Sequence, residues 1–448
     1  MHSFLDLCFK MKNTPVKQEI VNKIIAESGL KSVGNASIRE IVKVVSQIEA
    51  ASGVKFIRME MGVPGLDSPE IGVQAEIEAL QNGVASVYPN MEGLPELKNE
   101  TSRFIKSFMN LDLSPQGCIP TVGSMQGSMA AIMVANRCVP GKNKTLFIDP
   151  GFPVQKVQCK ALGVPFETFD VYEHRGAKLR DKLESILSKG DISSVIYSNP
   201  NNPSWICFTE EELRIIGEMA NKYELIIIED LAYFGMDFRL NIATPGVPPF
   251  QPTVANYTDN YILLISSSKV FSYAGQRLGM IAMSNTVFKK EYQALIPYFS
   301  CTDFGHAVIY GALYSLSAGT AHSSQYALAA MLKAANDGKY AFVDGVKPYG
   351  ERAAIMKKLF TDNGFYLVYD KDGEKPLADG FYFTINYPGF TGAQLLEELL
   401  YYGIGSIALK ITGSNHEGLR ACVSQFHPDQ AIDLKERLET FRENHPLN

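Results

Sequence analysis

The chain has 448 residues, of which 46% are hydrophobic and 20% are charged, a balance typical of a globular protein with a sizeable buried core. Its formal net charge of −6 argues against nucleic acid as a main partner, because no basic excess is present to neutralise phosphates. No run approaches the roughly 20 apolar residues of a membrane-spanning helix, so we expect no membrane partner.

The N-terminus and the cysteines both indicate a cytoplasmic protein. The first residues lack a basic start and a small-residue cleavage site, so we predict no signal peptide, and Met11 is a second candidate for the start. The seven cysteines are scattered and form no Cys-x-x-Cys pair, which is typical of reduced cysteine. The histidines show no metal-ligand spacing, and no metal is expected.

Residues 17–50 are predicted to be helical in two pieces that separate near Gly29 and Gly34, because aliphatic residues recur at helix-like spacing on either side. Further along, short apolar β-rich runs end in polar or Gly/Pro clusters. These runs are residues 145–148, 194–197, 225–228, 261–265 and 280–283. Helix candidates lie between them, at 125–138, 179–189 and 209–223. This alternation predicts a mostly parallel sheet covered by helices on both faces.

The pattern of predicted elements changes in the C-terminal third of the chain. Residues 306–335 are predicted to form one long helical stretch, and the chain from about residue 350 mixes helices with short strands such as 380–386. We therefore expect an α/β protein in three parts. These are a large αβα domain over 64–320, a smaller α+β domain over 321–448, and an N-terminal segment, 1–63, that packs with the smaller domain.

Polar residues follow each apolar run of the expected sheet. Asp149 to Phe152 follow the first run, the cluster 199–203 follows the second, Asp230 and Tyr233 follow the third, and Ser266 to Lys269 follow the fourth. In open α/β sheets, ligands bind beyond the carboxyl ends of the strands. We therefore expect these side chains to gather in a single site.

The residue types in this set suit a bound organic cofactor. A lysine amine such as that of Lys269 forms a Schiff base with an aldehyde, and a lowered pKa makes it a nucleophile and a base. A buried carboxylate can keep a pyridine nitrogen protonated. Arg277 can bind a phosphate bidentately. The segment 121–128 opens a predicted helix, and its free N–H groups form a second cradle for an anion.

An ordered set of motifs resembles the class I and II aminotransferases, which are fold-type-I pyridoxal-phosphate-dependent enzymes. The resemblance covers roughly residues 55–440, and its strongest stretch runs from Ser266-Ser267-Ser268-Lys269 to Arg277-Leu278-Gly279. The other matching segments are Gly62-Val63-Pro64, Tyr88 to Leu97, Asn199 to Pro203, Asp230 to Tyr233, and Leu419 to Ser424.

Two positions depart from the family pattern. Ser204 and Trp205 follow Pro203 where the family usually continues with Thr-Gly, and Trp205 could either narrow the pocket or simply pack. Met125 stands where many members have a polar residue, which matters little if only its backbone binds.

The resemblance implies a role for each matching residue. Pyridoxal 5′-phosphate would be bound through a Schiff base on Lys269, with Asp230 on the pyridine nitrogen, Tyr233 and Asn202 on the ring hydroxyl oxygen, and Phe152 stacked on the ring. The implied phosphate ligands are Ser124, the backbone of Met125, Ser266, Ser268 and Arg277. Tyr88 would reach the phosphate of a neighbouring subunit, which implies a homodimer. Arg420 would bind the substrate α-carboxylate, with Gly62 and Asn202 beside it.

The implied activity is the ping-pong transfer of an amino group between an L-amino acid and a 2-oxo acid, with Lys269, Asp230 and Tyr233 as the catalytic set. A carbon–sulfur β-lyase on the same scaffold is the alternative. A cofactor-bound regulatory module without turnover would carry a basic DNA-binding domain, and the N-terminal segment is too short and too mixed in charge for one. The motifs do not identify the side-chain specificity.

Overall fold

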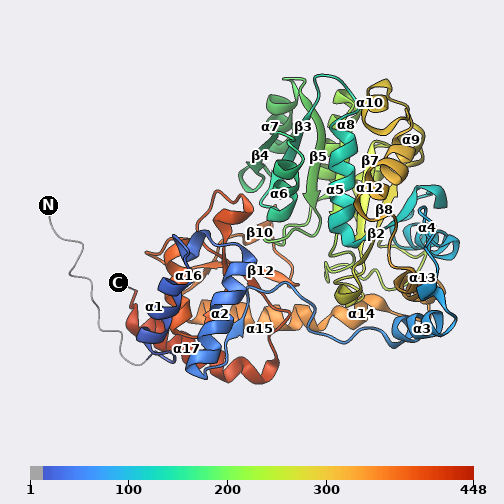
Figure 1. Cartoon of the computed structure of the whole chain (residues 1–448). Coiled ribbons are helices and arrows are strands. Elements are labelled where there is room, and N and C mark those ends of the chain that lie inside the picture. The colour runs from blue at the N-terminus through green and yellow to red at the C-terminus, as the bar shows by residue number, and fades with distance from the viewer. Residues whose placement is uncertain (1–13, 448) are drawn as a thin grey trace.

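The computed structural model describes residues 14–447, so the predictions about a signal peptide and Met11 lie outside the described residues. The chain forms a large part, which contains a seven-stranded sheet, and a smaller part, which contains a four-stranded sheet (Figure 1). Within residues 14–447, no helix is both long enough and apolar enough to cross a membrane.

The large sheet is mostly parallel, as the alternating pattern predicts. Its strands are ordered β2 (Cys118–Val122), β8 (Leu278–Met283), β7 (Tyr261–Ser266), β6 (Ile226–Leu231), β5 (Ile192–Ser198), β3 (Lys144–Asp149) and β4 (Phe166–Asp170). Only β8 runs antiparallel to its neighbours β2 and β7. Every residue of β5, β6, β7 and β8 is buried, because both faces of the sheet are covered.

Sequence patterns did not predict the two edge strands. β2 contains Pro120, which is tolerated at an edge because one side of an edge strand needs no hydrogen-bond donor. β4 is partly exposed and carries Glu167 and Thr168, so it lacks an apolar run.

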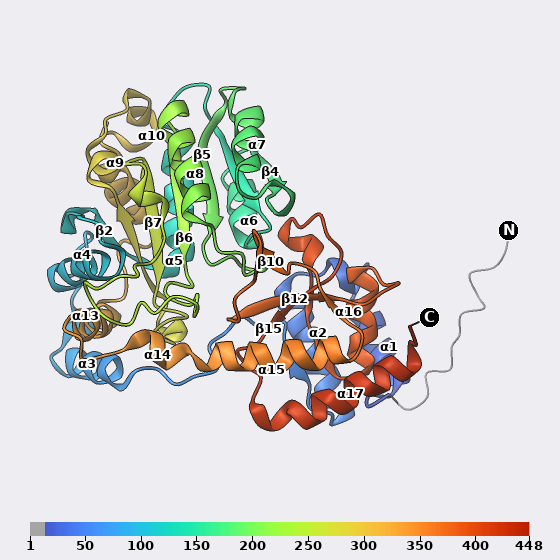
Figure 2. The ribbon, with the colours of Figure 1, turned by 180° about the vertical axis from the view of Figure 1, so that it is seen from behind.

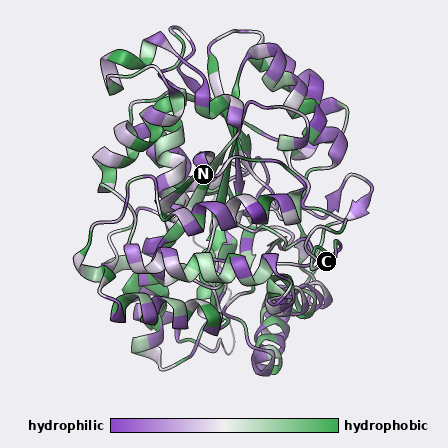
Figure 3. Cartoon of the chain, turned by 90° about the vertical axis from the view of Figure 1, so that its right-hand side faces the viewer, coloured by the Kyte–Doolittle hydropathy of each residue, from purple (hydrophilic) through white to green (hydrophobic). Residues whose placement is uncertain are grey.

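Helices cover the sheet on both sides. One face packs against α5 (Gly123–Ala135), α6 (Pro153–Ala161) and the segment 287–313, and the other packs against α4 (Pro95–Met109), α7 (Lys178–Leu187) and α8 (Glu210–Tyr223). The start of α8 is fixed by a capping box between Thr209 and Glu212. In Figure 3 the apolar strands lie inside, and the surrounding helices turn their hydrophilic faces outward.

The long helical stretch predicted over 306–335 is helical over most of its length but is interrupted once. The segment forms α11 (Phe304–His306), a π-helical stretch (Ala307–Leu313) and α12 (Tyr314–Ser317), and then a separate helix, α13 (His322–Asn336). Between them Ala318 and Gly319 adopt positive φ values of 52° and 125°, which end the first run. Apolar residues continue on both sides of this break, so periodicity alone did not reveal it.

The smaller part is an antiparallel sheet covered by helices. Its strands are ordered β14 (Ile407–Ala408), β15 (Leu419–Cys422), β12 (Tyr382–Asn386) and β9 (Tyr366–Leu367). Its helices are α15 (Pro348–Asp362), α16 (Gly392–Tyr401) and α17 (Ala431–Asn444). A separate short hairpin joins β10 (Lys371–Asp372) to β11 (Lys375–Pro376).

The N-terminal segment lies against this smaller part. It forms α1 (Gln18–Glu27) and α2 (Ile38–Ser52), which lie beside α16 and α17 in Figure 2. β1 (Ile57–Arg58) then pairs in parallel with β13 (Ile404–Gly405).

Helix α13 packs on α3 (Glu70–Gln81) and α4, which belong to the large part. We therefore propose that the smaller domain begins after α13 and not at residue 321. The short helices α9 (Asn285–Lys289), α10 (Ile296–Phe299) and α14 (Phe342–Val346) complete the chain.

Candidate active site

The polar residues that follow the parallel strands line a single cavity of about 460 Å³, between the sheet and the smaller part. Twelve of the residues expected from the sequence lie in its wall: Gly62, Ser124, Met125, Phe152, Asn202, Asp230, Tyr233, Ser266, Ser268, Lys269, Arg277 and Arg420. The volume is within the range of roughly 300–1,000 Å³ that small-molecule sites occupy. Tyr88, the thirteenth expected residue, is not part of this wall.

Lys269 follows β7 and extends into the cavity. Its Nζ donates a hydrogen bond to the carbonyl oxygen of Gly62, and no carboxylate among the described residues forms an ion pair with it. Burial lowers the pKa of the Lys269 amine to about 8, and the positive charges of Arg420 and Arg277 act in the same direction. A larger fraction of this amine is therefore neutral and nucleophilic near neutral pH than for an exposed lysine.

Asp230 is the penultimate residue of the buried strand β6. Its Oδ2 accepts a hydrogen bond of 2.9 Å from Nε2 of Gln155, and its Oδ1 accepts one of 3.1 Å from the backbone N–H of Ala232. Burial raises the pKa of the Asp230 carboxyl to about 6, and these two hydrogen bonds oppose the rise. A cation beside this carboxylate would be strongly stabilised, as a protonated pyridine nitrogen requires.

The N-terminus of α5 and Arg277 form a cradle for an anion. Gly123 begins α5 with a φ of +67°, and a Cβ at this position would lie 2.5 Å from Nη2 of Arg277. The guanidinium of Arg277 donates to the carbonyl of Ala274 at 2.8 Å and approaches Oγ of Ser268 at 3.5 Å. Free backbone N–H groups, serine hydroxyls and a guanidinium at one helix N-terminus suit a phosphate.

Arg420 lies on β15 of the smaller part and is 1% exposed. Its Nη2 donates to the carbonyl of Glu60 at 2.7 Å, its Nη1 approaches Oδ1 of Asn202 at 3.4 Å, and its guanidinium lies 4.6 Å from the ring centroid of Tyr382. Within residues 14–447, its Nε has no hydrogen-bond partner and no carboxylate pairs with it. A buried guanidinium without a counter-charge would bind a carboxylate ligand strongly.

Tyr382 is a lining residue that sequence reasoning missed. Its hydroxyl accepts a hydrogen bond of 2.9 Å from Tyr233, and a Cβ on Gly62 would lie only 2.3 Å from the same oxygen. Trp205 packs behind this pair, with ring centroids 5.4 Å from Tyr233 and 6.2 Å from Tyr382. Trp205 is fully buried and absent from the cavity wall, so it packs and does not narrow the pocket.

Other lining and supporting residues also carried no sequence signal. Gln155, which bonds Asp230, lies on α6 and is not part of a motif. Arg39, with Ile38 and Val42, reaches the cavity from α2, far away in the sequence. Only the tertiary packing of the N-terminal segment reveals this contribution.

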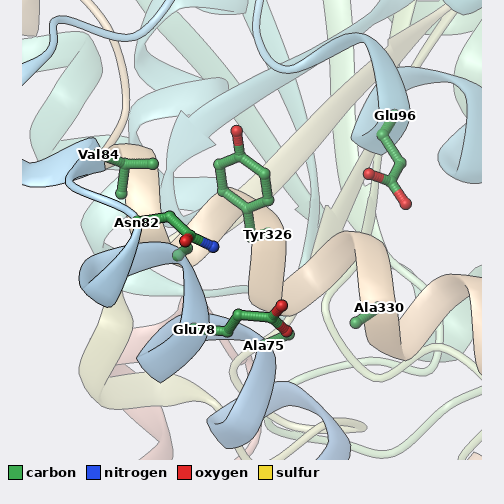
Figure 4. Close-up of a pocket in the computed structure, with 8 residues that line it drawn as sticks. Ala75, Glu78, Asn82, Val84, Glu96, Tyr326 and Ala330 are labelled. Carbon is green, nitrogen blue, oxygen red and sulfur yellow. The ribbon is translucent and has the colours of Figure 1, made fainter.

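A second cavity, of about 270 Å³, lies between α3, α4 and α13 (Figure 4). Its polar side chains include Glu78, Asn82, Glu96 and Tyr326, and its wall contains no basic residue. It therefore lacks the groups that would hold a phosphate or a carboxylate. No cluster of three or more metal-ligating side chains occurs in residues 14–447.

The family model for aminotransferase class I and II matches residues 54–425. The chain belongs to this family. Among curated relatives, it is 26% identical over 263 residues to the probable aspartate aminotransferase of Methanocaldococcus jannaschii, a match that covers 59% of this chain and 64% of that protein. It is 25% identical over 333 residues to the LL-diaminopimelate aminotransferase of Natranaerobius thermophilus, covering 72% of this chain and 77% of that one. The chain thus spans somewhat less than two thirds of the first of these relatives.

Solved structures share the fold of this class I and II aminotransferase chain. The alanine aminotransferase from Pyrococcus furiosus superposes with a TM-score of 0.74 at 18% identity, over 92% of this chain and 98% of that one. An aspartate aminotransferase from Thermus thermophilus superposes with a TM-score of 0.70 at 15% identity, over 94% and 98%. These matches confirm the expected fold-type-I α/β architecture.

The family depends on pyridoxal 5′-phosphate, and the cavity fits this cofactor. Its wall contains the anion cradle of α5 and Arg277, the buried carboxylate of Asp230, the amine of Lys269 and the guanidinium of Arg420. Because residue 123 is a glycine, the space beside the Arg277 guanidinium in the anion cradle stays open, and any side chain at this position would fill it.

Proposed function

We propose that this protein is a pyridoxal-phosphate-dependent aminotransferase that moves an amino group between an L-amino acid and a 2-oxo acid by a ping-pong mechanism. One observation carries the proposal: a lysine, a buried carboxylate, an anion cradle and a buried arginine with no carboxylate partner within residues 14–447 all line one cavity. The relatives named above are aminotransferases, which favours transamination over the carbon–sulfur lyase reaction.

Each proposed role follows from the position of a side chain. Arg277, Ser124, Ser266, Ser268 and the backbone of Met125 would hold the phosphate. Phe152 would pack on the face of the ring, and Asn202 and Tyr233 would bond its hydroxyl oxygen. When bound, pyridoxal phosphate supplies an aldehyde for the lysine amine and a ring that accepts electrons from the substrate.

Arg420 would bind the α-carboxylate of the substrate, beside Gly62 and Asn202. The charge of Arg420 acts on the amine of Lys269, so a substrate held by its α-carboxylate would lie in the same cavity as that amine. Lys269 would take the α-proton as a general base and return it as a general acid, a task that suits a pKa near the working pH. Asp230 would stay ionised beside a protonated ring nitrogen and so stabilise the positive charge there.

We also propose that the protein is a homodimer in which Tyr88 contributes to the phosphate site of the neighbouring subunit. Tyr88 is 90% exposed, and apolar side chains of Ile77, Leu80 and Val87 are exposed near it in sequence. Exposed apolar residues of this kind are typical of an interface. A cytoplasmic location stays a prediction that rests on the cysteine pattern.

Mixed dimers would test the shared site. A dimer that combines one Lys269→Ala subunit with one Tyr88→Phe subunit would contain one fully intact site if Tyr88 acts across the interface. That site would bind the cofactor as tightly as wild type. Weak cofactor binding at the site that keeps Lys269 would show that Tyr88 does not act in the neighbouring subunit's site.

The absorbance spectrum of the purified protein tests the reaction itself. We expect a visible cofactor band that shifts to the pyridoxamine form when an amino acid is added without an acceptor, with one equivalent of 2-oxo acid released. Accumulation of pyruvate with a thiol or ammonia would support the lyase instead. The variant Lys269→Ala should turn over no substrate while it still binds cofactor, and rapid turnover by that variant would refute the assignment.

A further inference from the structure

Tyr382 lines the cavity wall, but the proposed chemistry gives its hydroxyl no task. The side chain extends from β12 of the smaller part and is 1% exposed. Its hydroxyl accepts the 2.9 Å hydrogen bond from the hydroxyl of Tyr233, which also lines the cavity. Because Tyr233 follows β6 of the large sheet, this bond joins the two parts of the chain inside the site.

Packing on several sides fixes the position of the Tyr382 hydroxyl. Gly62 lies so close to it that a Cβ at position 62 would collide with the hydroxyl oxygen. The ring is in edge contact with Tyr233 and Trp205, with centroid separations of 5.4 and 6.2 Å. The guanidinium of Arg420 lies 4.6 Å from the ring centroid. The hydroxyl of Tyr382 therefore stays beside that of Tyr233 unless these neighbours move as well.

The hydrogen-bonding capacity of the two hydroxyls is not used up. Burial raises the pKa of both groups above the usual value, so each keeps its one proton at neutral pH. Tyr233 donates its proton to Tyr382, and within residues 14–447 the proton of Tyr382 has no acceptor. A hydroxyl proton turns easily about the C–O bond, so the direction of donation can reverse when Tyr233 meets a new acceptor.

We propose that Tyr382 is a positioning residue that acts through Tyr233: in the cofactor-loaded protein it donates to the Tyr233 oxygen, and Tyr233 donates to the ring hydroxyl oxygen. The inference rests on the proposed function, because it assumes that Tyr233 bonds this ring oxygen. In the cofactor-free protein the pair is directed the other way, and its bond to Tyr382 holds Tyr233 in place. A hydroxyl that accepts a hydrogen bond becomes a stronger donor, so this two-tyrosine relay strengthens donation to the ring oxygen.

A pH titration of the visible cofactor band measures the strength of that donation. At low pH the nitrogen of cofactor-bound Lys269 carries a proton, which offsets part of the negative charge on the ring oxygen. At high pH this proton is absent, and a hydrogen bond to the oxygen stabilises the system more. A weaker hydrogen bond therefore raises the midpoint of the titration. We expect Tyr233→Phe to raise it by about 1–2 pH units and Tyr382→Phe by about 0.3–0.6 unit, since the latter removes only the cooperative part.

A double variant tests whether Tyr382 acts through Tyr233. If it does, adding Tyr382→Phe to Tyr233→Phe should leave the midpoint where Tyr233→Phe alone places it. An equal rise in both backgrounds would show independent action and overturn the proposal. A lower midpoint in the single variant Tyr382→Phe would also overturn it, because Tyr382 would then compete with the ring oxygen for the proton of Tyr233.

Tyr387→Phe is the matched control. Tyr387 directly follows β12, is also 1% exposed, and donates a 2.5 Å hydrogen bond to the backbone carbonyl of His445, outside the cavity wall. Its loss removes a buried hydroxyl bond of the smaller part without touching the site, and the midpoint should stay at the wild-type value. A shift equal to that of Tyr382→Phe would overturn the proposal. All the variants keep the charged residues of the wall, which are Arg39, Asp230, Lys269, Arg277 and Arg420.

The pattern of results separates this inference from the proposed function. A midpoint that moves in Tyr233→Phe but not in Tyr382→Phe would refute the relay and leave the cofactor contacts standing. A wild-type protein that shows no visible band with cofactor would refute both. Titration of the loaded protein with acetate should give Tyr382→Phe an affinity within about twofold of wild type, because Arg420 is intact. An affinity loss of about tenfold without a change in the midpoint would assign the hydroxyl to the substrate carboxylate and overturn the relay.

Discussion

The variant Asp230→Asn should have opposite effects on the cofactor-free and the cofactor-loaded protein. Without cofactor, the Asp230 carboxylate is a buried negative charge that, within residues 14–447, accepts hydrogen bonds from Gln155 and Ala232 and has no cationic partner. Asparagine has nearly the same shape but no charge, and its side chain can still bond both neighbours once the Gln155 amide rotates. In the cofactor-free protein, the substitution therefore removes the energetic cost of a buried charge. In the cofactor-loaded protein, it removes the ion pair with the ring nitrogen.

The size of the effect follows from the pKa. Burial raises the pKa of Asp230 from 3.8 to about 6, so between these values the folded protein binds more protons than the unfolded chain. The contribution of Asp230 to stability falls as the pH rises through this window. Above pH 6 the difference corresponds to about 3 kcal/mol of destabilisation. Below pH 3.8 the carboxyl is neutral in both states, and the difference disappears.

Denaturant unfolding at pH 7.5 and pH 4 would measure the free energy of unfolding of wild type and variant. We expect cofactor-free Asp230→Asn to be more stable than wild type by up to about 3 kcal/mol at the higher pH and to come within about 0.5 kcal/mol of it at the lower pH. The loaded variant should lose activity by roughly 10²–10³-fold, because the ring nitrogen has no anionic partner. A cofactor-free variant that is less stable than wild type at pH 7.5 would show that the buried carboxylate of Asp230 does not destabilise the cofactor-free fold.

Other substitutions and conditions probe the remaining parts of the site. Arg420→Lys should raise KM for the amino acid roughly 10–100-fold with little change in cofactor affinity, because lysine lacks the bidentate fork; unchanged KM in steady-state assays would contradict this. The rate at which pyridoxal phosphate adds to the cofactor-free protein should rise with pH through about 8, because the Lys269 amine loses its proton there. Stopped-flow absorbance would measure this rate. An inflection near pH 10.5 would show that burial does not lower the pKa of Lys269. Gly62→Ala should impair substrate binding because its Cβ would lie 2.3 Å from the Tyr382 hydroxyl, and the second change Tyr382→Phe should restore part of kcat/KM. Failure of that rescue would point to another contact.

The sequence predicted the parts of the site that lie on motifs. Lys269 and Asp230 lie at the carboxyl ends of β7 and β6, Arg277 directly precedes the antiparallel strand β8, and the structure brings all three to one cavity. The edge strands β2 and β4 escaped detection because Pro120 interrupts one and polar residues occupy the other. Local composition cannot identify a strand that owes its position to its neighbours.

Contributions from distant segments were beyond sequence reasoning. Tyr382 and Arg39 carry no motif, and they reach the cavity only because β12 and α2 pack beside the end of the large sheet. The interruption at Ala318 and Gly319 was missed for a different reason, since apolar residues recur on both sides of it. Periodicity reports which face of a helix is buried, and it does not report where one helix stops and another begins.

The pairing of β1 with β13 has a consequence for how the protein is made. Ile57 leaves the ribosome early, while its partner Ile404 is synthesised near the end of the chain. At about 5–20 residues per second, the nascent N-terminal segment waits for tens of seconds before this strand pair can form. The large part has its complete sheet well before that. The part of the cavity that contains Lys269 can therefore fold first during translation. Arg39 and Arg420 can take their places in the cavity wall only after the last strands have been synthesised.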